Sequence, residues 1–480
     1  MTPLCSRRHF LYAGGFSLAN LALLDLLAAD KPPSKPNLEA MSFDLEPKPA
    51  HFAPKAKAMI SMNMVGGPSH IDLFDFKPEL VKLDGKPFPG KLKFDNQAQA
   101  SSRVQGPMWK FQKYGKCGME MSELVPHLGK VADDICLIRS MHTGVNNHIP
   151  SMYALNSGHQ LAGRPTLGSW LLYGLGCETK ELPAYVALTH PDGGPLVNSD
   201  NWSNGWLPSL YQGTAVRPKE PRILNLDPPD HLAGAPQAAQ LDLLRSLNEH
   251  HRREHPGESD LNARIANYEL AAKMQLAAKD AFDLTKETKQ TLEMYGVNKP
   301  ETKDYGTRCL IARRLVERGV RFVQIFAAGQ SWDHHDSIFP QLPKMCREVD
   351  RPAAALVADL KQRGLLDSTI VHWGGEMGRL PTIQVPPGGG GDTKNKIGRD
   401  HNTYGFSMWV AGGGFKRGHV HGATDEFAHH AVEGVVTHSD WLATVMHQFG
   451  LDPAKLTFKR NARDLTLTDG AGKVVDKILA

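Results

Sequence analysis

Arg321-Phe322-Val323-Gln324-Ile325-Phe326 is an apolar run of strand length, and its surroundings indicate the fold class. It follows a helical stretch at 309–316 and the glycine at 319. The same order of helix, glycine and apolar strand recurs over 355–373, and a further strand is expected at 406–411. This repetition predicts an α/β domain with a doubly wound, mainly parallel sheet and helices on both of its faces.

Other segments extend this pattern toward the N-terminus. Apolar runs at 58–65, before Gly66-Gly67-Pro68, and at 135–141 predict two more buried strands. Residues 190–236 are rich in Pro, Gly, Asn and Trp and are expected to form a long surface excursion. A helical insertion is expected near 240–300, because apolar residues recur there at helical spacing. They are Leu261, Ile265, Tyr268, Ala272 and Leu276.

Composition excludes several classes of protein. The chain has 480 residues, 41% of them hydrophobic, and a formal net charge of +4 without a long basic tract. Nucleic acid is therefore not an expected partner. The six cysteines are scattered and form no CxxC pair, which excludes a zinc ribbon or a disulfide-dense small fold. One or two disulfides and buried thiols both remain open.

The N-terminus is typical of an exported protein. Ser6-Arg7-Arg8-His9-Phe10-Leu11 begins a mainly apolar run that ends at Ala29, which resembles a twin-arginine signal and implies the twin-arginine export machinery as a partner. The alternative, an uncleaved membrane anchor, is disfavoured by Asp25 and by the many Gly and Ala residues. No later run approaches ~18 apolar residues, so no stable span is expected in the mature chain.

The chain is expected to consist of four parts and to be located in the periplasm or outside the cell. Residues 1–29 are expected to be the signal peptide, and residues 30–50 a Pro- and Lys-rich linker. Residues 51–465 are expected to form the α/β domain, and residues 466–480 a C-terminal tail.

Histidines and carboxylates collect at one predicted edge of the sheet. They follow the strands expected at 58–65, 135–141, 321–326 and 369–373, and they precede the strand at 406–411. Ligands bind at the carboxyl ends of strands in open α/β sheets, so a shared divalent metal site is expected there, for zinc or manganese rather than calcium. The residues singled out are His70, Asp72, His148, Asp333, His335, Glu376, Arg379, Arg399 and His401.

The same segments carry a family resemblance. The motifs are Gly66-Gly67-Pro68-Ser69-His70-Ile71-Asp72, Trp332-Asp333-His334-His335, Gly375-Glu376-Met377-Gly378-Arg379, Gly398-Arg399-Asp400-His401 and Gly422-Ala423-Thr424-Asp425. Together they resemble the bacterial domain of unknown function 1501 family over roughly residues 40–460. That family is similar to the sulfatase and alkaline phosphatase superfamily, whose doubly wound sheet carries two metals and a nucleophile at its carboxyl edge.

The resemblance implies a ligand set for the metal. Asp333 and His335 resemble an Asp-His ligand pair, and His401 resembles the last histidine ligand. Glu376 stands where a second metal has its carboxylate, while Met377 replaces the ligand beside it. His70 or Asp72 would close the site, and Arg379 or Arg399 would hold the anionic group of a substrate.

The expected nucleophile is missing. His148 stands where sulfatases have Cys or Ser, and Met152 replaces the Arg of the modification motif. His148 is therefore interpreted as a general acid or base, with a phosphohistidine intermediate or a ligand role as alternatives.

Two functional hypotheses follow. The first is an exported metal-dependent hydrolase of sulfate or phosphate esters that lacks the usual nucleophile and acts on a small-molecule or polysaccharide ester. The alternative is a non-catalytic exported binding or surface protein on a degenerate hydrolase fold.

Overall fold

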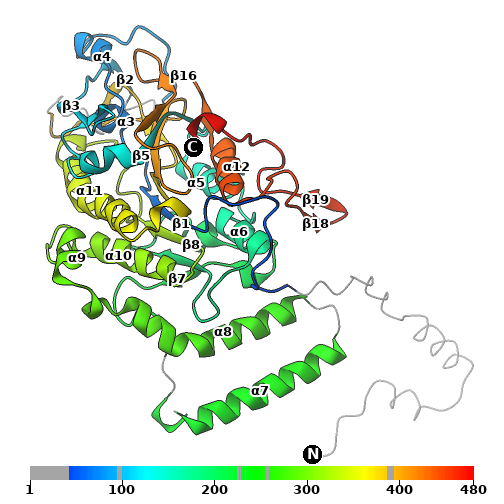
Figure 1. The fold of residues 1–480 in the computed structure, drawn as a ribbon. Coiled ribbons are helices and arrows are strands. Elements are labelled where there is room, and N and C mark those ends of the chain that lie inside the picture. Colours follow the sequence, from blue (N-terminus) through cyan, green and yellow to red (C-terminus); the bar gives the residue numbers. More distant parts are fainter. Residues whose placement is uncertain are drawn as a thin grey trace, which may run out of the picture.

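A nine-stranded sheet organises the molecule in the computed structural model, which describes residues 43–94, 100–223, 226, 229–232, 234–255, 259–385 and 394–480 (Figure 1). The predicted signal peptide and most of the linker lie outside these residues. The strand order is β14-β5-β13-β9-β1-β8-β6-β7, and β17 also pairs with β5. Their bounds are β1 Ala58–Asn63, β5 Ile135–His142, β6 Tyr185–Leu188, β7 Thr214–Val216, β8 Phe322–Phe326, β9 Thr369–Gly374, β13 Phe406–Ala411, β14 His419–His421 and β17 Val436–Thr437.

The sheet is mainly parallel, which confirms the predicted α/β class. β1 pairs in parallel with both β8 and β9, whereas β13 is antiparallel to its neighbours β5 and β9. Because β13 runs the opposite way, the residues that precede it lie at the same edge as the residues that follow β5, β8 and β9. This reversal brings the segment before β13 to the carboxyl edge of the sheet.

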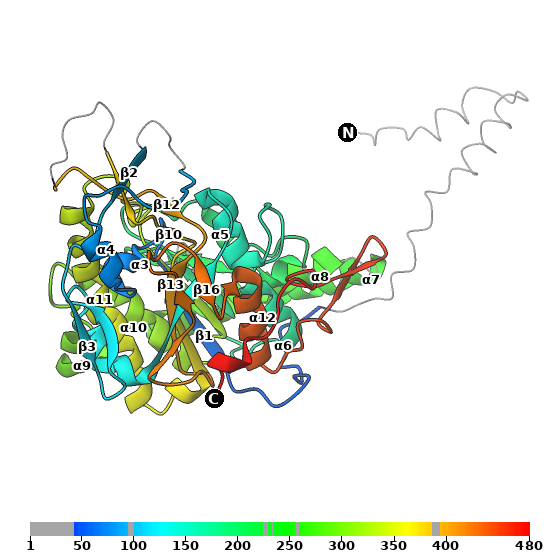
Figure 2. The same ribbon diagram turned by 90° about the horizontal axis from the view of Figure 1, so that it is seen from above.

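Helices cover both faces of the sheet (Figures 1 and 2). One apolar layer contains α10 (Lys303–Glu317), α11 (Ile338–Gln362) and the short helix η2 (Leu128–Asp134), and the other contains α5 (His148–Ser157), α6 (Leu167–Leu175) and α12 (His438–Gln448). Side chains along β1 point alternately to the two faces of the sheet, so the strand contributes to both layers. Ile60 and Met62 lie in the first layer, and Met59 lies in the second. All of β1 is buried, as an apolar strand between two helical layers should be.

The predicted helical insertion is present as α7 (Ala235–Glu254), α8 (Ser259–Phe282), η6 (Leu284–Lys286) and α9 (Lys289–Met294). The side of α8 that packs on the domain differs from the one expected, because Ala263, Met274, Ala278 and Ala281 are buried whereas Tyr268 is 64% exposed. Small side chains allow the helix to approach the domain closely. Tyr268 and Ala272 instead line a groove between α8 and α7.

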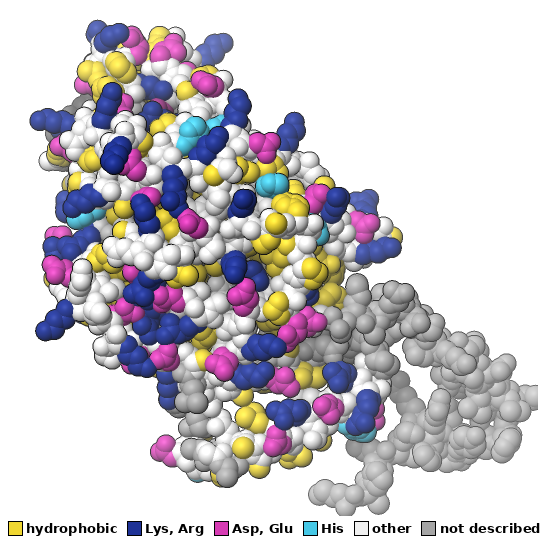
Figure 3. All heavy atoms as spheres, viewed as in Figure 1, with side chains coloured by type: hydrophobic (Ala, Val, Ile, Leu, Met, Phe, Trp, Pro, Cys, Tyr) yellow, Lys and Arg dark blue, Asp and Glu magenta, His cyan; other side chains and the backbone are white. Residues whose placement is uncertain are grey.

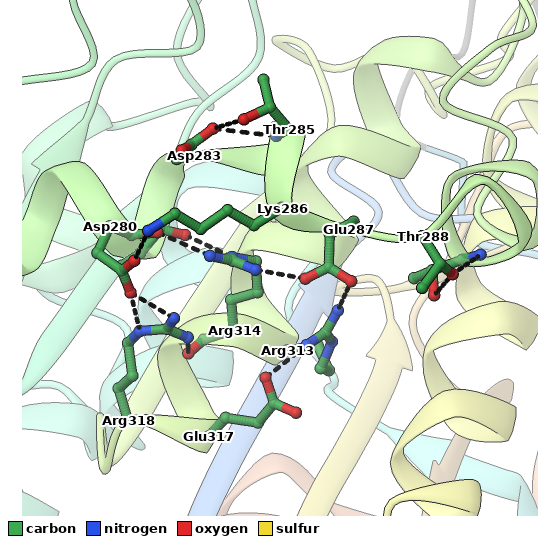
Figure 4. A network of polar contacts seen from close by, with 12 residues as sticks. Asp280, Asp283, Thr285, Lys286, Glu287, Thr288, Arg313, Arg314, Glu317 and Arg318 are labelled. Atoms are coloured by element: carbon green, nitrogen blue, oxygen red, sulfur yellow. Dashed lines mark hydrogen bonds and ion pairs between the residues drawn. The ribbon is translucent and has the colours of Figure 1, made fainter.

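A network of ion pairs joins the end of the insertion to α10 (Figure 4). Arg313 Nη2 lies 2.7 Å from Glu287 Oε2, Arg314 pairs with Glu287 Oε1, and Arg318 Nη2 lies 2.6 Å from Asp280 Oδ2. Arg314 also donates to the carbonyl oxygens of Asp280 and Ala281 at the end of α8. These contacts fix α8 and η6 against the domain.

Two segments expected outside the core contribute to it. Residues 190–236 include β7, and they bury Trp202 and Tyr211, so the prediction of a surface excursion is wrong for this part. The segment expected to be a tail also packs on the domain, because Ile478 is buried and the backbone of Ala480 donates to Gly414. Both segments have a composition typical of loops, but each contains aromatic or aliphatic residues that pack in the core. This explains why the two segments are more buried than expected.

The remaining elements are short and surround the sheet edges. They are α3 His70–Leu73, α4 Pro78–Lys82, β2 Ala100–Val104, β3 Phe111–Tyr114, β4 Met119–Ser122, η3 Asn198–Trp202, η4 Ser209–Tyr211, η5 Asp230–Leu232, η7 Leu366–Ser368, β10 Gly378–Arg379, β11 Thr382–Gln384, β12 His401–Asn402, β15 Ala423–Thr424, β16 Ala431–Glu433, β18 Phe458–Arg460, β19 Arg463–Leu465 and η8 Asp476–Ile478. Among the described helices, none has the length and apolarity that a membrane span requires. All five described cysteines are free thiols.

Candidate metal centre

Four side chains from different segments meet at the carboxyl edge of the sheet. They are His148, Asp333, His335 and His401, and each offers one donor atom within 4.8 Å of the others. His148 is the first residue of α5, Asp333 and His335 follow β8, and His401 begins β12 before the antiparallel strand β13. The fold therefore joins parts of the chain that are about 250 residues apart.

The three imidazoles present the same atom, Nε2, to the Asp333 carboxylate. His335 Nε2 and His401 Nε2 lie 3.1 Å and 3.4 Å from Asp333 Oδ1, and His148 Nε2 lies 3.3 Å from Oδ2. His335 Nε2 and His401 Nε2 are 2.9 Å apart. Ligands about 2.0–2.1 Å from a tetrahedral cation are roughly 3.3 Å from each other, which is close to these separations. The four side chains thus form a group that could hold a metal ion.

Two outer residues orient these imidazoles. Glu376 Oε1 lies 2.6 Å from His148 Nδ1, and Gln384 Oε1 lies 2.7 Å from His335 Nδ1. Holding Nδ1 fixes the ring and directs Nε2 inward, as the outer partners of metal-binding histidines do. Glu376 is fully buried, and it also accepts hydrogen bonds from the Gly66 backbone at 2.9 Å and 3.2 Å. It lies behind His148 and outside the four-residue group, which differs from the ligand role expected for it.

The electrostatics of the cluster depend on burial and on Arg379. Burial alone would raise the pKa of Asp333, but Arg379 and hydrogen bonds from the three histidines hold it well below its usual range. Burial lowers the pKa of His401 to about 3. Burial opposes a charge on His148 too, yet hydrogen bonds with Asp333 and Glu376 raise its pKa to about 9. The side chains of Asp333 and His335 are 17% and 27% exposed, so the cluster meets solvent on their side.

Arg379 is directed inward and pairs with Asp333. Its Nη2 lies 2.5 Å from Asp333 Oδ1, and its other contacts are backbone oxygens, including Gly67 O at 2.9 Å and Arg399 O at 3.2 Å. The guanidinium is fully buried, so it does not face a substrate as expected. Gly66 permits this packing, because a Cβ there would lie 2.5 Å from the Asp333 nitrogen.

Asp72 and Arg399 pair with each other rather than joining the cluster. Arg399 Nε and Nη2 lie 2.8 Å and 3.2 Å from the two Asp72 oxygens, and both side chains are fully buried. The remaining Arg399 donors reach the backbone oxygens of Gln105, Gly106 and Leu380. Neither residue is therefore placed to bind a metal or an anion, because a bidentate pair already uses their charges.

His70 is also outside the cluster. Its Nε2 contacts Ala428 O at 2.8 Å, and its ring packs against Gly378, where a Cβ would lie 2.6 Å from Nδ1. Burial lowers the pKa of His70, so a neutral ring is expected there. The glycine turn after β1 directs this side chain under β10 and away from Asp333.

The sequence over residues 56–479 matches the family described as "Protein of unknown function (DUF1501)". The chain belongs to this family. The DUF1501 resemblance inferred from the motifs is thereby confirmed. A comparison with curated proteins gave no match.

Solved structures to which this DUF1501 chain is similar include three bacterial proteins. A sulfatase from Pseudoalteromonas sp. is 14% identical, with 74% of this chain and 66% of that chain covered and a TM-score of 0.34. The lipoteichoic acid synthase LtaP from Listeria monocytogenes is 9% identical, with 90% and 79% covered and a TM-score of 0.37. An alkaline phosphatase superfamily protein from Vibrio parahaemolyticus is 12% identical, with 97% and 80% covered and a TM-score of 0.34.

Proposed function

We propose that this protein is an exported, metal-dependent hydrolase of sulfate or phosphate esters. The observation that carries the proposal is the convergence of three histidine Nε2 atoms on the Asp333 carboxylate at distances of 3.1–3.4 Å. A divalent cation bound by such a set polarises an ester oxygen and lowers the pKa of a bound water toward ~7.

His148, Asp333, His335 and His401 are the proposed ligands. Three nitrogen donors favour zinc or manganese over calcium, which prefers oxygen ligands. Because Glu376 holds its Nδ1, His148 fits a ligand role better than the general acid or base role first expected of it. Glu376 is proposed as the residue that positions His148.

The N-terminus of α5 supports an anionic substrate. His148 is the first residue of this ten-residue helix, so the positive end of the helix dipole opens on the cluster. The two arginines expected to hold the anion are buried in other pairs. The cation and the α5 N-terminus are thus the proposed sources of affinity for a sulfate or phosphate group.

The test uses the full chain, freed of metal by a chelator and then supplied with zinc or manganese. Hydrolysis of aryl sulfate or aryl phosphate esters should appear only after the cation is added. Asp333→Asn should abolish it, whereas Asp336→Asn, which removes an exposed carboxylate three residues away, should not. A metal-loaded protein that binds one cation per chain and hydrolyses none of these esters would contradict the proposed activity.

One observation favours the second candidate, a non-catalytic binding protein on the same fold. Arg379 already pairs with Asp333 from the interior, and Glu376 and Gln384 already hold the Nδ1 atoms of His148 and His335. Such a network of contacts is stable whether or not the protein catalyses a reaction. Binding of phosphate or sulfate without turnover in the same assay would support this candidate.

A further inference from the structure

The helix α7 carries an apolar surface that the rest of the described chain does not cover. It lies at the margin of the molecule, beyond α8 (Figure 1). Its main described neighbours are α8 and η5. Leu243 is 60% exposed, Leu247 is 54% exposed and Leu244 is 44% exposed. Figure 3 shows hydrophobic side chains among the charged ones on this part of the surface.

Two parallel stripes run along α7, each with the alternating spacing of four and three residues that is typical of helix bundles. One stripe faces α8 and includes Gln237, Leu241, Leu244 and Asn248. Gln237 Nε2 donates to Gln275 Oε1 at 3.2 Å, and Leu241, Leu244 and Asn248 line a groove of about 590 Å³ with Tyr268 and Ala272 of α8. The other stripe, here called the outer seam, consists of Pro236, Gln240, Leu243, Leu247, His250 and Glu254, all exposed.

A helix with two such stripes is typical of a four-helix bundle, in which each helix packs against two neighbours. The α7–α8 hairpin supplies one neighbour only. An isolated helix of this length is marginal in water, because most helical stability in proteins comes from tertiary packing. Among the described residues, the outer seam therefore has no packing partner of the kind that its spacing predicts.

We propose that the outer seam packs antiparallel against the outer seam of a second copy of this chain, so that two hairpins form a four-helix bundle. A two-fold contact requires that each residue facing a partner position is faced by that position in return. The seam has this symmetry. Leu243 faces Leu247 of the second copy, Gln240 faces its His250, and Pro236 faces its Glu254.

Charge supports an identical partner. Because each residue turns by about 100°, the charged side chains of α7 from 241 to 253 point about 100° or more away from the middle of the seam. They are Asp242, Arg245, Glu249, Arg252 and Arg253. No like charges therefore oppose each other at its centre. At each end, Glu254 meets the first turn of the partner helix, where the helix dipole favours a negative charge.

The middle of the outer seam is apolar. Leu243 and Leu247 lie at the middle of the outer seam, so a two-fold contact brings four exposed leucine side chains together. A specific dimer buries about 800 Å² per partner, of which these residues would form the apolar centre.

The test is sedimentation velocity on the full chain over a range of concentrations, where we expect a species with twice the 52.8 kDa mass of the chain. Leu243→Glu/Leu247→Glu should yield the monomer. Arg252→Glu makes the same change of −2 in net charge on the side of α7 away from the seam and should leave the dimer intact. Leu243→Ala/Leu247→Ala, which keeps α7 helical because Ala is a strong helix former, should weaken the dimer at least about 100-fold.

Hydrogen exchange of the α7 backbone gives a second readout. Protection of residues 235–254 should rise with protein concentration in the parent chain and should not rise in the Ala double variant. A chain that stays monomeric at all concentrations would overturn the proposal, as would a dimer that both leucine variants leave unchanged. Concentration-independent protection in a monomer would also overturn it and would indicate that the apolar run of residues 11–29 covers the seam instead.

Discussion

Glu376 is the residue whose position changes the interpretation of the site. Its Oε1 lies 2.6 Å from His148 Nδ1 and it is held in turn by the Gly66 backbone, so its carboxylate fixes one imidazole of the cluster. Glu376→Gln keeps the shape but weakens this hydrogen bond. We expect the affinity for zinc to fall about 10–100-fold, with an unchanged unfolding temperature of the metal-free protein.

Competition with a chromophoric chelator measures this affinity. An unchanged zinc affinity in the Gln variant would show that Glu376 does not position a ligand. Complete loss of metal with a normal fold would instead return Glu376 to the direct ligand role that the sequence suggested.

The sequence indicated which residue types collect at the site but not how they pair. Asp333, His335 and His401 were expected as ligands and do lie together, because each is adjacent to a buried strand whose end could be located. Asp72, Arg379 and Arg399 are at the same edge, yet their charges are used in buried pairs that depend on side-chain direction. Gln384 was missed because a single glutamine on a three-residue strand carries no sequence signal.

The helical insertion depends on the ion pairs at its end (Figure 4). Glu287 is 6% exposed and pairs with both Arg313 and Arg314. Glu287→Gln leaves buried cations without this counter-charge and should lower the free energy of unfolding by roughly 3 kcal/mol. Lys286→Ala removes the neighbouring pair with Asp280, whose lysine is 57% exposed, and should cost less than about 1 kcal/mol. Urea unfolding measures the free energy of unfolding of both variants. Equal losses in the two variants would contradict the greater importance of the buried pair.

A buried carboxyl in α11 predicts a pH dependence. Asp350 accepts hydrogen bonds from the backbones of His127 and Leu128, each at 2.8 Å, and burial nevertheless raises its pKa to about 7. Because an unfolded Asp has a pKa of about 3.9, the folded state holds this proton more tightly. The stabilising contribution is fully present below pH ~4 and is lost as the pH rises through 7.

Asp350→Asn removes that titration. The free energy of unfolding of the parent chain relative to this variant should fall by up to about 4 kcal/mol between pH 4 and pH 8. Urea unfolding at several pH values tests this, since titrations common to both proteins cancel in the difference. A constant difference would show that the two backbone donors keep Asp350 ionised throughout.

Buried strands were the most predictable elements. A continuous apolar run of strand length between glycine-rich loops usually forms a buried strand. Five strands were located in this way, namely β1, β5, β8, β9 and β13. The direction of β13 could not be predicted, since an apolar run carries no information on whether its neighbours are parallel. β6 and β7 were missed because four and three residues are too few for a periodic signal.

Export concerns the chain as a whole. The segment Ser6-Arg7-Arg8-His9-Phe10-Leu11 is proposed to direct the folded protein across the membrane by the twin-arginine route. Arg7→Lys/Arg8→Lys keeps the charge but alters the paired guanidinium groups. We expect the precursor to accumulate in the cytoplasm, as cell fractionation and immunoblotting would show, whereas normal export of the variant would contradict the proposed route.

At the scale of the whole molecule, the fold is proposed to assemble one cation site from His148, Asp333, His335 and His401. Elemental analysis of the full chain, dialysed after exposure to zinc or manganese, tests it most directly. We predict about one bound cation per chain in the parent protein, and almost none in His335→Ala/His401→Ala with an unchanged fold by circular dichroism. If the parent chain retains no more cation than this double variant, the four residues do not form a cation site.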